Sequence, residues 1–477
     1  MKQFLRPLTI SFWTAALAVV LTSGIVSAIE KVKDPPEKKE GPKLTLNSKP
    51  AFSVLKSGEK QTTWIRVGLK GFHLTSEAER APLNVAIVLD RSGSMQGEKL
   101  QRAREAAVNA LEVLKPTDIV SVIAYDTDVS VLVPATRLTD REQVASVIRG
   151  IQAQGNTALF GGVSKGAAEV RKFLDDRHVN RIILLSDGLA NVGPSSPGEL
   201  GALGASLKKE NISVSTLGLG LGYNEDLMVA LAGQSGGNHQ FIENASELAS
   251  IFRREFDEVL SAVAQEVDIK VQIPEGIRPV RVLGNSADIN GQSIVSRLSQ
   301  VYSDQQKHIV IEMEIPAELA ATPTDGKVAA LKLASVEVTY ANLCNHQSES
   351  LAGEIAVTFS TSDDAVKASR DNTVMADVVA LVASEQNKYA TQLLDQGDLM
   401  RCREVLIGNS AYLRENAVEL KVDSLNFFAD INEMQSKKLE DAKSNTAPSA
   451  VATRKAQRAF QSQVDQQAPA IAQPKNE

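Results

Sequence analysis

The sequence predicts an α/β protein in which a doubly wound, mostly parallel sheet is inserted in, or lies next to, an antiparallel β-sandwich, with a helical hairpin or small bundle at the C-terminal end. Three observations predict this architecture. Residues 83–262 alternate short apolar runs with helical stretches, residues 263–371 alternate apolar and polar side chains, and residues 372–443 return to helical spacing. Strand and helix in regular succession form a parallel sheet covered on both faces, whereas a period of two is typical of half-buried antiparallel strands.

The first residues of the chain, 1–28, have the pattern of a secretory signal peptide. Lys2 and Arg6 give a positive start, a mostly apolar run follows, and the run closes with small residues at Val26-Ser27-Ala28. The apolar run is also nearly long enough to remain as an uncleaved membrane anchor, and that alternative stays open. In either case we expect the bulk of the chain to be exported to the periplasm, the cell surface or the medium.

Two segments have compositions that disfavour a packed core. Residues 29–43 are rich in Lys, Glu, Asp and Pro, and residues 444–477 are rich in Ala, Gln, Pro and Ser. Such segments bury too little apolar surface to offset the entropy lost on folding. We therefore predict a charged linker before the folded part and a disordered tail after it.

The length, formal charge and cysteine and histidine content of the chain exclude some functions. With 477 residues the chain is too long for one hydrophobic core, and a formal charge of −7 argues against nucleic acid as the main partner. Two cysteines and five scattered histidines make no zinc site. The sequence leaves open whether Cys344 and Cys402 form a disulfide or whether Cys402, at helical spacing with Leu399 and Leu406, is a buried free thiol.

The α/β part is predicted from four near-continuous apolar runs, as expected of strands that are buried on both faces. These runs are 84–89, 119–125, 182–185 and 214–219. Apolar residues from Leu100 to Leu114 fall at helical spacing between the first two runs. Right-handed crossovers between the strands are then expected.

The β-sandwich is predicted from both sides of the α/β part. Val267, Ile269 and Val271 alternate with polar residues, and so do Ile65, Val67 and Leu69 in the segment 44–82 before the α/β part. Asn290-Gly291 is a strong hairpin turn signal. We expect one sandwich assembled from both segments, although two separate small β units would fit the same pattern. In the helical part, Gly397-Asp398 predicts the turn of an antiparallel helix pair, and a third helix begins near Ser424.

Oxygen-bearing side chains gather at the ends of the predicted parallel strands. Asp90-Arg91-Ser92-Gly93-Ser94 follows the first strand, Asp187-Gly188 follows another, and Gly155-Asn156-Thr157 precedes a helix. Ligands of open α/β sheets bind beyond the carboxyl ends of the strands, so these loops should share one rim. Any one fragment alone is explained by a helix cap or a turn. Their combination predicts a site of hard oxygen ligands for Mg²⁺, with Ca²⁺ or Mn²⁺ as the alternatives.

Residues 83–262 resemble a von Willebrand factor type A (VWA) domain, a Rossmann-like fold. The stretches LNVAIVLDRSGSM, GNTALFGG and ILLSDGLANVG carry this resemblance. The residues that match the metal-ion-dependent adhesion site of the family are Asp90, Ser92, Ser94, Thr157 and Asp187. The flanking segments distantly resemble inter-alpha-trypsin inhibitor heavy chains.

The resemblance implies that the protein supplies part of the shell of one divalent cation and leaves a position for an Asp or Glu carboxylate of a partner protein. It implies a binding module for adhesion or envelope assembly rather than an enzyme. The alternatives are a metal-stiffened scaffold of a larger complex and, with less support, a hydrolase, since the chain has no HExxH motif. In some relatives ligand capture moves the last helix, here residues 246–262, but a sequence cannot show two populated states.

Two further motifs have simpler explanations than function. The glycines of 218–222 resemble a dinucleotide fingerprint, but they follow a late strand instead of the first, and we interpret them as a loop. Asp126 and Asp128 flank a turn after the second strand, where a solvated turn is a simpler interpretation than a second cation site.

Overall fold

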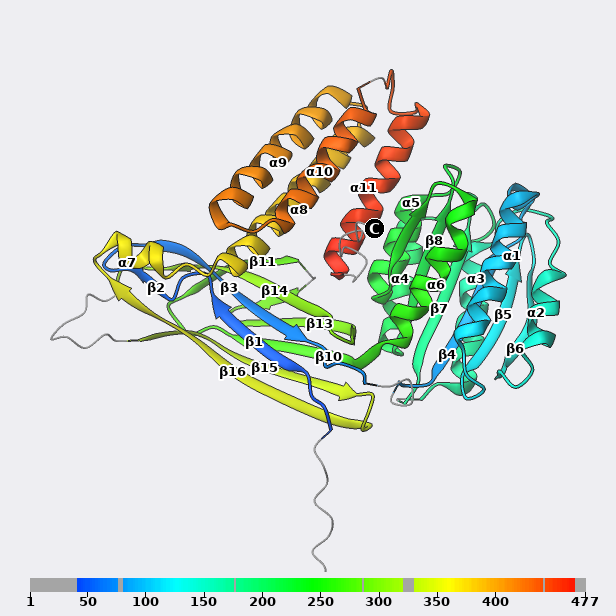
Figure 1. Ribbon diagram of the computed structural model, residues 1–477, viewed down its shortest axis with the longest axis horizontal. Helices are drawn as coiled ribbons and strands as arrows, with labels where there is room; N and C mark the ends of the chain where they lie inside the picture. The colour runs from blue at the N-terminus through cyan, green and yellow to red at the C-terminus, as the bar shows by residue number, and fades with distance from the viewer. Residues whose placement is uncertain are drawn as a thin grey trace, which may run out of the picture. The chain divides into compact units, whose positions relative to one another are not determined.

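The computed structural model describes residues 41–75, 80–175, 177–284, 287–320, 330–440 and 442–467 (Figure 1). The predicted signal peptide and most of the charged linker lie outside these residues. Within the described ranges, no helix is both long enough and apolar enough to cross a membrane.

A six-stranded sheet forms the centre of the α/β part, as predicted. Its strand order is β6-β5-β4-β7-β8-β9, and every neighbouring pair is parallel except the β5–β6 hairpin at one edge. The strands are β4 (Leu83–Asp90), β5 (Ile119–Tyr125), β6 (Val129–Arg137), β7 (Val179–Ser186), β8 (Ile212–Leu219) and β9 (His239–Ile242). The apolar runs of β4, β5, β7 and β8 are buried along their whole length, because helices cover both faces.

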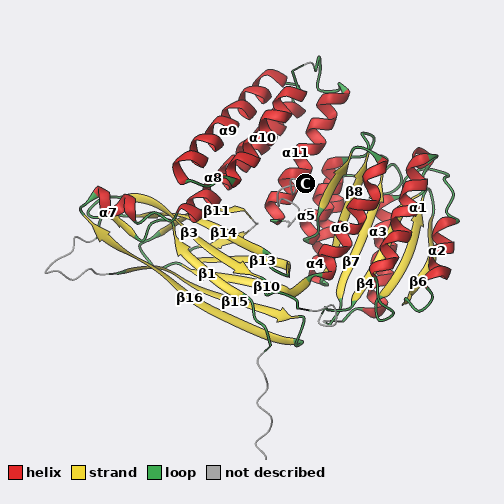
Figure 2. Cartoon of the chain, viewed as in Figure 1, coloured by secondary structure: helices red, strands yellow, loops and turns green. Residues whose placement is uncertain are grey.

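Three helices pack on each face of this sheet (Figure 2). One face carries α1 (Glu98–Ala110), α2 (Arg141–Arg149) and α6 (Leu248–Leu260). The other face carries α3 (Leu159–Val170), α4 (Pro197–Lys209) and α5 (Glu225–Ser235). Side chains alternate between the two cores along each strand, so that Val85 and Ile87 face the first set of helices while Ala86 and Val88 face the second.

The β part is one sandwich built from segments on both sides of the α/β part. Its smaller sheet has the order β1-β3-β14-β11 and its larger sheet the order β12-β13-β10-β15-β16-β2. The strands are β1 (Thr45–Pro50), β2 (Val54–Lys56), β3 (Gln61–Lys70), β10 (Ala262–Gln272), β11 (Arg278–Gly284), β12 (Ala287–Asn290), β13 (Ser293–Tyr302), β14 (Gln306–Ile315), β15 (Leu331–Asn342) and β16 (Gln347–Ser360). A common core that includes Ile65, Ile311, Ile269 and Val338 joins the two sheets, which decides against two separate β units.

The helical part contains five helices within the described residues. They are α7 (Asp363–Ala368), α8 (Asn372–Asp395), α9 (Leu399–Leu420), α10 (Ser424–Lys438) and α11 (Pro448–Gln466). Asp371 and Asp398 cap α8 and α9 by accepting hydrogen bonds from backbone N–H groups of the first turns. Gly397, with φ at +86°, makes the predicted turn between them.

The prediction of a disordered tail over residues 444–477 was wrong for its first part, because α11 occupies residues 448–466, and residues 468–477 lie outside the described ranges. This helix is ordered by small residues and by polar groups that find partners elsewhere in the chain. Ala450 packs in a core with residues of α8 and α9, and Val464 packs with Leu283 of β11 and Leu381 of α8. No disulfide joins the two cysteines: Cys402 is buried inside the helical part and Cys344 is partly exposed.

Arg181 of β7 joins the α/β part to the sandwich. Its guanidinium is fully buried and donates hydrogen bonds to Gln300 Oε1 (2.8 Å) and the Tyr302 hydroxyl (2.5 Å) of β13, and to Ser215 Oγ (3.1 Å) of β8. Glu255 and Glu258 of α6 lie in the same buried cluster, where Asn238 donates to both. Buried charges are retained only where partners compensate for lost hydration, so this contact ties the base of the sheet to the sandwich.

Candidate metal-binding site

The predicted site residues lie at one rim of the parallel sheet. Asp90 ends β4, and β7, its parallel neighbour, leads directly into Asp187. Thr157 lies in the loop before α3, and its N–H donates to Asn191 Oδ1 (2.9 Å) of the loop that follows Asp187. The carboxyl ends of neighbouring parallel strands therefore bring three separate loops together.

Asp90 is fully buried at this rim. Its Oδ1 accepts a hydrogen bond from Ser92 N–H (2.8 Å) and its Oδ2 accepts one from Ser186 Oγ (2.6 Å). Burial, together with the nearby charge of Asp187, raises the pKa of Asp90 to about 6 against the effect of these hydrogen bonds. A carboxylate in this environment is stabilised by any positive charge that approaches it.

The hydroxyl groups converge on one point. Ser94 Oγ lies 3.0 Å from Ser92 Oγ and donates to Asp187 Oδ1 at 2.6 Å. A Cβ atom added at Gly188 would lie 3.1 Å from Thr157 Oγ1, 3.2 Å from Ser94 Oγ and 3.8 Å from Ser92 Oγ. The fold thus brings the three hydroxyls together beside Gly188, with Asp187 bonded to the Ser94 hydroxyl and Asp90 to the Ser92 N–H.

Several supporting residues were not predicted from the sequence. Ser186 holds Asp90, and the ammonium group of Lys99 contacts Asp187 Oδ2. Ser186 directly precedes Asp187, and Lys99 lies in the first turn of the helix after the Asp90 loop. Their positions next to the Asp187 and Asp90 loops are therefore the sequence feature from which these two residues could have been predicted.

Asp126 stabilises the loop that follows β4. Its Oδ2 accepts hydrogen bonds from Arg91 Nε (2.6 Å) and Gln154 Nε2 (3.0 Å), and its Oδ1 accepts one from Asp128 N–H (2.8 Å). Burial alone would raise the pKa of Asp126, but these hydrogen bonds and the charge of Arg91 hold it below its usual value. The carboxylate is thus satisfied by protein groups, which favours the turn interpretation over a second cation site.

The donor set of the rim fits a hard divalent cation. It consists of two carboxylates and three hydroxyls, with no thiolate or imidazole among them. Oxygen-only ligands with few formal charges suit Mg²⁺ or Ca²⁺ and disfavour zinc or copper. In the described part of the chain, no group of three or more His, Cys, Asp or Glu side chains offers another metal site.

The loop between β8 and α5 borders the same rim. A Cβ atom at Gly222 would lie 2.9 Å from the carbonyl oxygen of Asp187, so the two loops are in close contact. The Tyr223 ring covers Gly218, where an added Cβ would lie 2.2 Å from the ring. The glycines of 218–222 therefore allow close packing beside Asp187.

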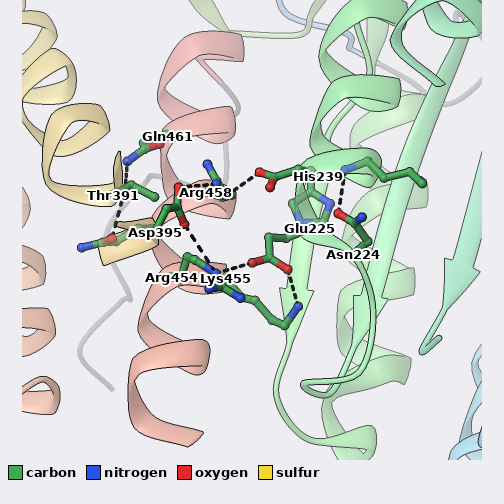
Figure 3. A network of polar contacts seen from close by, with 12 residues as sticks. Asn224, Glu225, His239, Thr391, Asp395, Arg454, Lys455, Arg458 and Gln461 are labelled. Atoms are coloured by element: carbon green, nitrogen blue, oxygen red, sulfur yellow. Dashed lines mark hydrogen bonds and ion pairs between the residues drawn. The ribbon is translucent and has the colours of Figure 1, made fainter. Parts of the chain in front are cut away.

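Helix α11 holds this loop from the outside (Figure 3). Lys455 Nζ donates to the Tyr223 carbonyl oxygen (2.5 Å) and to Glu225 Oε2 (2.6 Å), and it lies 3.9 Å from the centroid of the Tyr223 ring. Arg454 Nε binds the other oxygen of Glu225 at 2.6 Å. Arg458 bridges Asp226 of α5 and Asp395 of α8. A helix near the C-terminal end is thus paired with the loop that flanks the candidate site.

Comparisons with known proteins agree with this geometry. The family model of the von Willebrand factor type A domain matches residues 84–254. The chain is 27% identical over 330 residues to the uncharacterized protein sll0103 of Synechocystis sp., covering 67% of this chain and 76% of that protein. It is also 27% identical over 198 residues to inter-alpha-trypsin inhibitor heavy chain H3 of Rattus norvegicus, covering 40% of this chain but 22% of that protein.

Solved structures share the fold. A von Willebrand factor type A protein from Catenulispora acidiphila superposes with a TM-score of 0.64 at 16% identity, covering 82% of this chain and 90% of that chain. The ArnB paralog VWA2 from Sulfolobus acidocaldarius superposes with a TM-score of 0.57 at 17% identity, covering 88% and 99% of the two chains. Both the sequence and the fold therefore show that this chain contains a von Willebrand factor type A domain and is distantly similar to inter-alpha-trypsin inhibitor heavy chains.

Proposed function

We propose that this chain is an exported, metal-dependent protein-binding protein that serves in adhesion or envelope assembly. Its VWA domain would hold one divalent cation, with Mg²⁺ favoured over Ca²⁺ and Mn²⁺, and would capture an Asp or Glu carboxylate of a partner protein. The residues that would hold the ion are Asp90, Ser92, Ser94, Thr157 and Asp187.

The observation that carries this proposal is the convergence of oxygen atoms beside Gly188. Three hydroxyl oxygens from two loops lie within 3.8 Å of the position that a Cβ atom at Gly188 would take. One of them, Ser94 Oγ, donates a hydrogen bond to Asp187. When bound, a divalent cation would act as a Lewis acid that accepts an outside carboxylate. Two carboxylates balance its charge, and neutral hydroxyls leave it attractive to a further anion.

The contacts around Asp90 and the loop that follows it have positioning roles in this proposal. Ser186 and the Ser92 N–H fix the orientation of the Asp90 carboxylate. The Arg91–Asp126 pair holds the loop that carries both serines. Supporting contacts of this kind set the direction of ligands and the affinity of a site. The signal-peptide pattern of residues 1–28 supports the proposed export.

Titration of the purified chain with Mg²⁺ by isothermal calorimetry tests the metal site. We expect one bound ion per chain, and we expect Asp90→Ala to remove that binding because half of the anionic charge is lost. Asp128→Ala is the matched control, since Asp128 is an exposed carboxylate at the same rim that contacts Asp126 only through its backbone. Equal binding by Asp90→Ala and the parent chain would refute the proposal.

Thr157→Ala separates partner capture from a scaffold role. The variant removes one hydroxyl at the rim and leaves the backbone contact with Asn191 in place. We expect an intact fold by circular dichroism. We also expect the variant to lose the envelope proteins that the parent chain captures in Mg²⁺ and does not capture in chelator. Unchanged capture would favour the metal-stiffened scaffold, and residual hydrolysis of a substrate would favour an enzyme.

A further inference from the structure

Helix α9 has an apolar inner face and an unusual outer face. Its inner side chains, including Cys402, Leu406 and Leu413, are buried against α8 and α10. On its outer face, Met400, Ile407 and Val418 are 73%, 52% and 79% exposed. A helix on the surface of a globular protein normally presents polar residues to water. Three exposed apolar side chains on one helix therefore require an explanation.

The outer residues follow the spacing of a coiled-coil seam. The seam positions, separated by four and three residues in turn, are Met400, Glu404, Ile407, Ala411, Arg414 and Val418. This alternation is the a and d pattern of a heptad repeat, which keeps one stripe facing a partner helix over several turns. All six positions are exposed, so no element of the described part of the chain covers the apolar side chains of the seam.

We propose that α9 pairs in antiparallel orientation with α9 of a second copy of this chain, around a two-fold axis at the level of residue 409. The seam positions are arranged symmetrically about residue 409. Met400 then faces Val418 of the second copy, Ile407 faces Ala411, and Glu404 faces Arg414. In a two-fold interface each contact occurs twice, so one self-complementary stripe suffices.

The two charged seam residues select this orientation. A parallel pair would place Glu404 against Glu404 and Arg414 against Arg414, which repel. Glu404 forms no ion pair among the described residues. Arg414 binds Asp430 Oδ1 (2.7 Å) and Glu433 Oε2 (2.8 Å) through Nη2 alone, which leaves its other donors for a carboxylate of the second copy.

Small residues near the axis allow a close approach. Gly408 and Ala411 lie on the exposed side of α9, and a Cβ atom at Gly408 would meet no atom within 4 Å. Glycine in the middle of a helix lowers the stability of the helix. No neighbouring atom in the described chain explains why a glycine stands at position 408. The distance between paired helices depends on the side chains at their contact, so these residues suit the crossing point.

Disulfide trapping tests the register. In a Cys344→Ser background, we expect a mixture of Met400→Cys chains and Val418→Cys chains to form crosslinked dimers on mild oxidation. Each variant alone should remain uncrosslinked, because its two cysteines would lie about 27 Å apart along the antiparallel pair. Crosslinking by each variant alone would indicate a parallel pair and overturn the proposal.

Sedimentation velocity tests the association itself. We expect the parent chain to shift from monomer to dimer with increasing concentration, and Ile407→Glu to raise the dissociation constant at least tenfold. The matched control is Ile289→Glu, because Ile289 is exposed to a similar extent, 42%, on β12. Chelator should leave the dimer unchanged, since no residue of the candidate metal site takes part. A parent chain that stays monomeric at a few hundred micromolar refutes the proposal.

Discussion

Asp90 shows how one residue acquires its properties from both local and distant contacts. Its bond to the Ser92 N–H is fixed by the local turn, whereas its bond to Ser186 exists only because β4 and β7 are neighbours in the sheet. The identities of the five proposed ligands could be predicted from the sequence, because each follows a strand or precedes a helix. The supporting Arg91–Asp126 pair could not, because nothing in a linear pattern shows that these two charges meet.

Gly188→Ala should impair metal binding without unfolding the protein. The new methyl group would lie 3.1 Å from Thr157 Oγ1 and 3.2 Å from Ser94 Oγ, where it crowds the oxygens proposed to hold the ion. We expect the Mg²⁺ affinity to fall at least tenfold in calorimetric titration.

Gly198→Ala is the control for this substitution, since Gly198 lies in the first turn of α4 with no atom within 4 Å of an added Cβ. Unchanged Mg²⁺ affinity in Gly188→Ala would mean that the hydroxyls do not form the binding site.

At the scale of elements, α11 shows where composition misleads. Lys455 is only 1% exposed, and a lysine in an Ala- and Gln-rich segment predicts a solvated tail. Its burial is compensated by Glu225, the Tyr223 carbonyl oxygen and the Tyr223 ring, all of which lie more than 200 residues away in the sequence. The helix therefore depends on partners that no local window contains.

Lys455→Met should destabilise the folded chain. The substitution leaves the buried Glu225 with Arg454 as its remaining cation, so part of the compensation for its lost hydration disappears. We expect the free energy of unfolding to fall by about 2–3 kcal/mol in chemical denaturation. We also expect weaker Mg²⁺ binding, because the loop beside Asp187 loses its outer support.

Lys438→Met on α10 is the matched control, since Lys438 is exposed. Equal stabilities of the two variants and the parent chain would show that α11 is not held through Lys455.

At the scale of the whole molecule, buried polar groups lie where the parts of the chain meet. Arg181 joins the sheet to the sandwich. His239 of β9 contacts Thr216 Oγ1 (2.8 Å) and the Tyr223 hydroxyl (3.3 Å) beneath α11. His308 of β14 donates its backbone N–H to Gln467, directly after α11, at 2.6 Å. The imidazoles of His239 and His308 are withdrawn from water at these junctions, which makes the folded chain sensitive to acid.

Stability should fall as the pH decreases below about 6.5. Burial, together with the charge of Lys455, lowers the pKa of His239 to about 3, and burial lowers the pKa of His308 to about 4. In the unfolded chain both pKa values are near 6.5, so acid protonates the unfolded state first and favours it. Each histidine then removes about 1.4 kcal/mol of stability per pH unit until its folded pKa is reached.

Comparison of the parent chain with His239→Gln isolates this effect from carboxylates such as Glu258, whose pKa is raised to about 7 mainly by burial and which act in the opposite direction. Between pH 6.5 and pH 4.5 we expect the parent to lose about 2–3 kcal/mol more than the variant in urea denaturation. Parallel stability curves for the two proteins would contradict a neutral, buried His239.

The sequence by itself determined the α/β and β patterns and the five residues that we propose as metal ligands, because buried strands, helix faces and turns each leave a recognisable pattern within a short window. Only the tertiary structure decided that one sandwich joins segments on both sides of the α/β part, that α11 is folded, and that Lys455 is paired with Glu225. Whether a polar side chain can be buried depends on partners that compensate for its lost hydration, and those partners are brought together only by the complete fold.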